Sequence, residues 1–153
     1  MREIENPAHE LAEAMADFSS DPLGFVMFAF PWGEAGELEA YSGPETWQVD
    51  LLNALGSGVI SIQDALARAM AFDEEEECRP IQLARTSGHG IGKSACVSWI
   101  ILWGIATYED TKGVVTANTE NQLKTKTWAE LAKWYRLFIG KSLFKLTATA
   151  LFS

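Results

Sequence analysis

The sequence has few of the residues from which metal centres and disulfide frameworks are built. It contains two cysteines, Cys78 and Cys96, and two histidines among 153 residues. No CxxC pair occurs, so a zinc site has too few ligands, and we expect both cysteines to be reduced, as in a cytosolic protein. The acidic run 73–77 is most simply a solvated loop or linker rather than a metal site, because its like charges repel one another.

Long apolar runs are also absent. The longest, from Ala95 to Thr107, has about thirteen residues, which is short of the roughly 18 that suggest a membrane span. The first residues, Met1 to Glu5, lack the basic-then-apolar order of a secretory signal peptide. We therefore expect no membrane span, no export and a cytoplasmic location.

Charge is divided unevenly along the chain. Hydrophobic residues make up 48% and charged residues 22%, a composition typical of a globular protein with a real core. Residues 1–78 carry 2 basic and 17 acidic residues, a net charge of -15, whereas residues 79–153 carry 10 basic and 4 acidic residues, a net charge of +6. We therefore predict two parts, an acidic and mainly helical N-terminal region (1–78) and a basic core (79–153).

Helical patterns dominate the first part. Apolar residues recur at helical spacing in residues 4–18, and Ser20-Asp21-Pro22 has the form of an N-cap followed by proline in a first helical turn. The expected elements are helices at 4–18, 23–30, 45–55 and 61–71, a surface loop at 33–41, and a helix end at Gly56-Ser57-Gly58.

After Pro80 the pattern alternates between strand and helix. The expected order is a strand at 81–86, a helix at 93–108, a strand at 113–117, a helix from the capping box Thr119–Gln122 to about Phe138, and a third strand at 144–152. Such an order predicts an α/β fold with a parallel sheet and a ligand at the carboxyl ends of its strands.

A glycine-rich loop lies between the first of these strands and the helix after it. Glycines allow backbone N–H groups to turn toward phosphate oxygens, the helix N-terminus favours negative charge, and a lysine reaches the outer phosphates. The sequence therefore predicts a P-loop in an incomplete P-loop NTPase fold (RecA-like, three-layer αβα). Its phosphate-binding residues are Ser87, Gly88, His89, Gly90, Ile91, Gly92, Lys93 and Ser94.

Two residues of this loop have specific expected roles. Lys93 pairs with the β- and γ-phosphates of ATP, and the Ser94 hydroxyl coordinates Mg²⁺. His89 is a loop residue rather than a catalytic base. The strict motif has glycine where this chain has Ser87, so a purely structural glycine turn stays an alternative.

Gln48 lies beside the apolar side of the helix expected at 45–55. Its amide offers both a donor and an acceptor, the pair needed to read the N6/N7 edge of adenine. An ordinary polar helix residue is the alternative interpretation.

The chain resembles the N-terminal ATPase part of tailed-phage terminase large subunits, which are the motors that package viral DNA. The resemblance lies in three segments that occur in the same order, 46–52, 84–94 and 115–122. The resemblance covers roughly residues 20–153. It implies that Gln48 senses adenine, that Arg85 precedes the P-loop, and that residues 116–122 couple ATP to DNA. The candidates for this coupling are Thr116, Asn118, Thr119, Gln122, Lys124 and Lys126. Four basic residues on the same predicted helix would contact DNA phosphates: Lys124, Lys126, Lys133 and Arg136. The alternative interpretation is that they form a solvated helix face.

The same resemblance implies the ligands and partners. These are ATP, Mg²⁺, double-stranded DNA, a terminase small subunit, a portal protein and further copies of the chain, in a bacterial host cell that carries a phage or prophage. The chain departs from the family in one important respect. No apolar strand ending in Asp-Glu follows Ser94, and no nuclease domain is present, so no catalytic residue is identified.

We therefore expect a truncated reading frame, a split gene or a prophage remnant. Two other functions stay open. The chain could be a nucleotide-binding module that does not hydrolyse ATP, or a different P-loop enzyme of helicase-like or kinase-like type.

Overall fold

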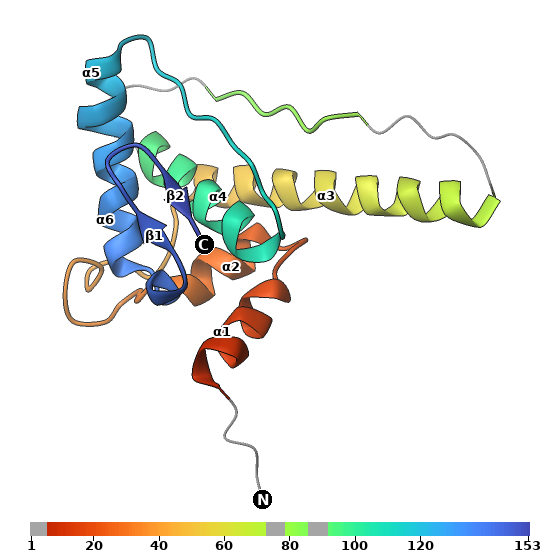
Figure 1. Cartoon of the computed structure of the whole chain (residues 1–153), viewed down its shortest axis with the longest axis horizontal. Helices are drawn as coiled ribbons and strands as arrows, with labels where there is room; N and C mark the ends of the chain where they lie inside the picture. The colour runs from red at the N-terminus through yellow and green to blue at the C-terminus, as the bar shows by residue number, and fades with distance from the viewer. Residues whose placement is uncertain (1–5, 73–78, 86–91) are drawn as a thin grey trace, which may run out of the picture.

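The computed structural model describes residues 6–72, 79–85 and 92–153. Helices form most of it. The helices Pro7–Ala16, Pro22–Ala29 and Ala129–Leu137 pack on the helix Lys93–Thr107, whereas the long helix Thr46–Phe72 extends away from them (Figure 1). The elements are α1 (Pro7–Ala16), α2 (Pro22–Ala29), α3 (Thr46–Phe72), α4 (Lys93–Thr107), α5 (Glu120–Gln122), the π-helical η1 (Leu123–Trp128), α6 (Ala129–Leu137), the 3-10 helix η2 (Lys141–Leu143), β1 (Lys145–Leu146) and β2 (Leu151–Phe152).

The predicted fold class is wrong. In the described part of the chain the only sheet is the antiparallel pair of β1 and β2, with Lys145 opposite Phe152, so there is no parallel RecA-like sheet. The segments 81–85 and 113–117, where strands were predicted, form no strand, and Val114 is 89% exposed. An apolar, β-branched segment indicates extended backbone, but a strand also requires a neighbouring strand, which local sequence does not specify.

The third predicted strand, 144–152, is also wrong in part. It is a hairpin, in which β1 and β2 are joined through a turn at Thr147–Ala150. The Thr147 side-chain oxygen accepts a hydrogen bond from the Ala150 N–H at 3.0 Å, and the Thr147 N–H donates to the Ala150 carbonyl at 2.8 Å. Threonine can bond to nearby backbone in this way, and the resulting turn divides the alternating pattern into two short strands.

The helix end predicted at Gly56-Ser57-Gly58 is absent, because α3 runs without a break from Thr46 to Phe72. Gly56 is buried, and a Cβ atom there would lie 3.1 Å from the Ser20 carbonyl oxygen. A Cβ on Gly58 would lie 2.9 Å from a side-chain carbon of Ile81. Both glycines therefore permit close packing against the helix instead of ending it.

Several local predictions are confirmed. Asp21 caps α2, since its side chain accepts the Gly24 N–H at 2.9 Å and Pro22 occupies the first turn. Helix α4 has the predicted bounds to within one residue at its end. Thr119 caps α5, which continues through η1 and α6 as one helical stretch to Leu137.

One hydrophobic core is formed from both sides of residue 78. It is richest where α2, α4 and α6 meet, and its aromatic rings pack edge to face, as in the Trp99–Trp134 pair (centroids 5.1 Å apart) and the Phe30–Trp134 pair (5.0 Å). The buried apolar residues are Met15, Phe25, Val26, Ala29, Phe30, Leu38, Leu52, Leu55, Ala95, Cys96, Trp99, Leu102, Trp103, Leu131, Trp134 and Phe138.

Candidate nucleotide-phosphate site

The N-terminus of α4 has the features of an anion site. Gly92 precedes it with φ of +83°, a left-handed conformation that glycine adopts without steric cost, and among the described residues no side chain caps the helix. The first-turn N–H groups of an α-helix have no partner within the helix and carry its positive dipole end. Lys93 is exposed and Ser94 is half-buried in this first turn, which is the position where a phosphate would be held.

Gln48 joins α3 to this helix start. Its side chain is 4% exposed, its Nε2 donates to the Gly92 carbonyl at 2.9 Å, and its Oε1 accepts from the Glu45 N–H at 2.8 Å. A Cβ atom on residue 92 would lie 2.6 Å from the Gln48 Nε2. Both polar ends of the amide are therefore used within the chain, where they hold the backbone before α4. An adenine contact by Gln48 stays a prediction, and it would use the second N–H and the second lone pair of the amide.

A cleft of about 780 Å³ opens beside Lys93 and Ser94. Ligand pockets in proteins commonly have volumes of roughly 300–1,000 Å³, so the cleft has the size of a small-molecule site. Its walls come from the loop after α2, the start of α3, the first turn of α4, η1 and α6. The lining residues are Trp32, Glu37, Leu38, Tyr41, Gly43, Glu45, Gln48, Gly92, Lys93, Ser94, Ala95, Trp99, Thr125, Lys126, Ala129, Glu130, Lys133 and Trp134.

The cleft contains equal numbers of formal positive and negative charges. Its cations are three lysines, and its anions are Glu37, Glu45 and Glu130. Two of these carboxylates accept indole N–H groups, Glu45 from Trp47 at 3.2 Å and Glu130 from Trp134 at 3.0 Å. These hydrogen bonds orient the two carboxylates.

Of the other predicted nucleotide-binding residues, Arg85 lies over the Trp47 ring, with its guanidinium carbon 5.2 Å from the ring centroid, and it is not among the residues that line the cleft. The predictions for Ser87, Gly88, His89, Gly90 and Ile91 lie outside the described residues.

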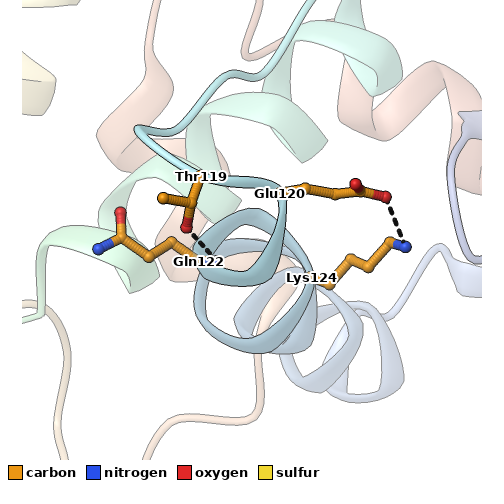
Figure 2. Close-up of polar contacts among 4 residues, drawn as sticks. All are labelled: Thr119, Glu120, Gln122 and Lys124. Carbon is orange, nitrogen blue, oxygen red and sulfur yellow. Dashed lines mark hydrogen bonds and ion pairs between the residues drawn. The ribbon is translucent and has the colours of Figure 1, made fainter.

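The predicted coupling segment has mainly local contacts. Thr116 and Asn118 are exposed, and the Thr119 side-chain oxygen accepts the Gln122 N–H at 3.1 Å (Figure 2). Such an N-cap bond satisfies a backbone donor at the start of α5. The four side chains therefore have no described contact with the cleft.

Lys124 also lies away from the cleft. Its Nζ is 2.7 Å from the Glu120 Oε1, one helical turn earlier, as Figure 2 shows. Lys124 lines a separate, mainly apolar cavity of about 610 Å³ between α4, the segment 111–128 and the hairpin. A role for these residues in coupling ATP to DNA stays a prediction.

Sequence reasoning missed the aromatic wall of the cleft. Trp32, Trp99 and Trp134 come from a loop and two helices, and their rings pack against one another with centroids 5.1 to 5.8 Å apart. Tryptophan at helical spacing normally indicates core, and no local signal shows that these three rings meet beside Ser94. The four basic residues 124, 126, 133 and 136 were grouped for DNA contact, whereas only Lys126 and Lys133 line the cleft.

Cys96 follows the first turn of α4 but is a poor candidate for reaction or metal binding. Burial raises the pKa of its thiol to about 11, because the thiolate would lose its hydration. Within the described ranges, no group of three or more His, Cys, Asp or Glu side chains is arranged to hold a metal ion.

Compared with known protein families, with curated proteins and with solved structures, the chain shows no match in any of the three. None of the helices formed by the described residues is both long enough and apolar enough to span a membrane.

Proposed function

We propose that the cleft binds the phosphate groups of a nucleoside triphosphate, with ATP as the nucleotide. The observation that carries the proposal is the start of α4, where a helix N-terminus that no described side chain caps presents Lys93 and Ser94 to a cleft of about 780 Å³. Backbone N–H groups and a helix dipole attract phosphate oxygens, and a lysine ammonium adds a full positive charge.

Mg²⁺ is the cofactor that accompanies this ligand. A magnesium ion prefers oxygen ligands, retains several waters and binds through substrate phosphates with one or two protein oxygens. The hydroxyl of the half-buried Ser94, in the first turn of α4, can supply one such protein oxygen. When bound, the ion would neutralise phosphate charge, and the protein contribution is the hydroxyl and the shape of the cleft.

The wider setting that we propose is the ATP-binding part of a DNA-packaging motor of the terminase type. The support is the ordered set of three motifs, together with the hydrogen bond between Gln48 and Gly92, which links the first motif to the second. Duplex DNA, a small subunit, a portal protein and oligomers of this chain are the partners that the proposal implies.

Titration with fluorescent ATP and Mg²⁺ tests the phosphate site. Lys93→Ala is expected to weaken binding about tenfold or more, because it removes a charge-assisted contact worth roughly 1.5–3 kcal/mol. Lys112→Ala removes an exposed lysine outside the cleft and serves as the matched control, with an expected change below twofold. Equal affinity of the wild type and Lys93→Ala would refute the assignment.

A second candidate function is binding without hydrolysis. It is favoured because Glu45 and Glu130, two of the three carboxylates in the cleft, accept indole N–H groups, and a carboxylate that accepts such a bond is a weaker base toward an attacking water. Phosphate release under single-turnover conditions distinguishes the two functions. Binding without release supports the second candidate, whereas release that is lost in Lys93→Ala supports an ATPase.

A further inference from the structure

The four basic side chains of the helical stretch 120–137 belong to different surfaces. Lys126 and Lys133 line the cleft, Lys124 lines the apolar cavity, and Arg136 lines neither. Residues two apart on a helix point to different sides, which explains the separation of Lys124 from Lys126. Lys126 and Lys133 are seven residues apart, about two turns, so they share one face.

The two lysines in the cleft differ from Lys124 in their contacts. Lys124 is neutralised by Glu120 at 2.7 Å, whereas neither Lys126 nor Lys133 forms an ion pair within the described part of the chain. Lys133 is half-buried, with its Nζ 5.4 Å from the centroid of the Trp134 ring, a cation–π contact that keeps the ammonium at the aromatic wall. The cleft thus holds two lysines that form no ion pair with a described carboxylate, although its formal charges balance.

Trp99, in the wall of the same cleft, carries a buried polar atom without a described partner. Trp99 is 2% exposed and lines the cleft, yet its Nε1 is the one buried side-chain nitrogen or oxygen without a hydrogen bond among the described residues. Burying an N–H group without an acceptor is costly. Because this nitrogen is closed to solvent, a bound molecule could accept its N–H only after a shift of the Trp99 ring.

The lysines on η1 and α6 line the same cleft as the first turn of α4, and their ammonium groups have the chemistry to bind an anion there. η1 is π-helical, and such turns are frequent at functional sites. From these observations we infer that Lys126 and Lys133 bind the outer phosphates of the nucleotide, from a second wall of the cleft. The inference rests on the proposed function, and it assigns to the nucleotide two residues that sequence reasoning assigned to DNA.

The test compares four single variants of the full chain. Lys126→Ala and Lys133→Ala remove the cations in the cleft, while Lys124→Ala and Arg136→Ala remove cations from the same helical stretch outside it. Binding of fluorescent ATP is measured with Mg²⁺, and unlabelled ATP, AMP and inorganic tripolyphosphate are used as competitors. Far-UV circular dichroism and thermal unfolding confirm that each variant folds.

We expect each variant in the cleft to lower the affinity for ATP and for tripolyphosphate about tenfold. The affinity for AMP should change less than twofold, because AMP lacks the outer phosphates. Both control variants should stay within twofold of wild type. Lys133→Arg keeps the charge and should retain most of the affinity, and it provides a second measurement if Lys133→Ala does not fold.

The outcomes separate this inference from the proposed function. If the wild type binds neither ATP nor tripolyphosphate, the proposed function fails and the inference with it. If Lys93→Ala weakens binding but the variants in the cleft behave like the controls, the inference alone is overturned. Loss of duplex DNA binding in Lys126→Ala and Lys133→Ala, with unchanged ATP affinity, would also overturn it and assign the two lysines to DNA.

Discussion

At the scale of single residues, Gly92 is the position where backbone and packing requirements coincide. Its φ of +83° disfavours any residue with a Cβ atom, and the Gln48 amide occupies the space that a Cβ would need. The same amide binds the Gly92 carbonyl. Gly92 and Gln48 therefore act together to set the direction in which α4 begins.

Gly92→Ala tests this requirement. We expect the free energy of unfolding to fall by about 2–3 kcal/mol, since a left-handed conformation costs about 1–2 kcal/mol and the displaced Gln48 hydrogen bond about 1 kcal/mol more. Urea unfolding measures the change. Gly113→Ala is the control, because a Cβ there meets nothing within 4 Å, and it should change stability by about 0.5 kcal/mol or less. Equal losses in the two variants would contradict this account.

Residues with local signals were predicted well from sequence, and residues that depend on distant contacts were not. Asp21 and Thr119 each form their cap with the N–H group three residues ahead, within reach of local reasoning. Gln48 was selected for its donor and acceptor, but its partner Gly92 is 44 positions away. Nothing local indicated that the Trp99 ring would line the cleft.

At the scale of elements, α3 shows how packing overrides propensity. Two glycines in three residues normally favour a helix end, yet Gly56 and Gly58 let the Ser20 carbonyl and Ile81 approach the helix closely. The segments 81–85 and 113–117 illustrate the reverse case. Their composition suits a strand, but the described chain provides no neighbouring strand, so a parallel sheet could not be inferred safely from alternation alone.

Substitutions at the exposed Ser57 test the continuity of α3. In a helix interior, Ser57→Pro should cost about 3 kcal/mol or more, because proline removes a hydrogen bond and clashes with the preceding turn. Ser57→Ala should stabilise by a few tenths of a kcal/mol through helix propensity. Thermal and urea unfolding measure both. A helix that ended at Gly56 would tolerate the proline, and that result would contradict the continuous α3.

At the scale of the whole molecule, contacts between the acidic and basic halves hold the fold together. The Trp103 Nε1 donates to the Phe18 carbonyl at 2.8 Å, the Tyr108 hydroxyl donates to the Ser19 carbonyl, and the Ile139 N–H donates to the Ala29 carbonyl at 2.9 Å. Helices α1 and α2 both pack on α4. The division of charge at residue 78 is therefore not accompanied by a division of the core.

A shared core predicts a single cooperative unfolding transition. Tryptophan emission and far-UV circular dichroism should give the same urea midpoint, because the buried indoles and the helices are lost together. Phe25→Ala, at a fully buried core position in α2, should lower both midpoints equally, with a loss of about 3–5 kcal/mol. Two separate transitions, with only one affected by Phe25→Ala, would instead indicate that residues 1–78 and 79–153 fold independently.

The aromatic wall of the cleft also has a spectroscopic consequence. Three of the six tryptophans, Trp32, Trp99 and Trp134, surround the proposed phosphate site, and the nearly perpendicular Trp99–Trp134 pair should produce strong near-ultraviolet circular dichroism. Trp128 lines the apolar cavity instead. A molecule that enters the cleft therefore changes the polarity around half of the tryptophans, so the chain carries its own optical reporter of occupancy.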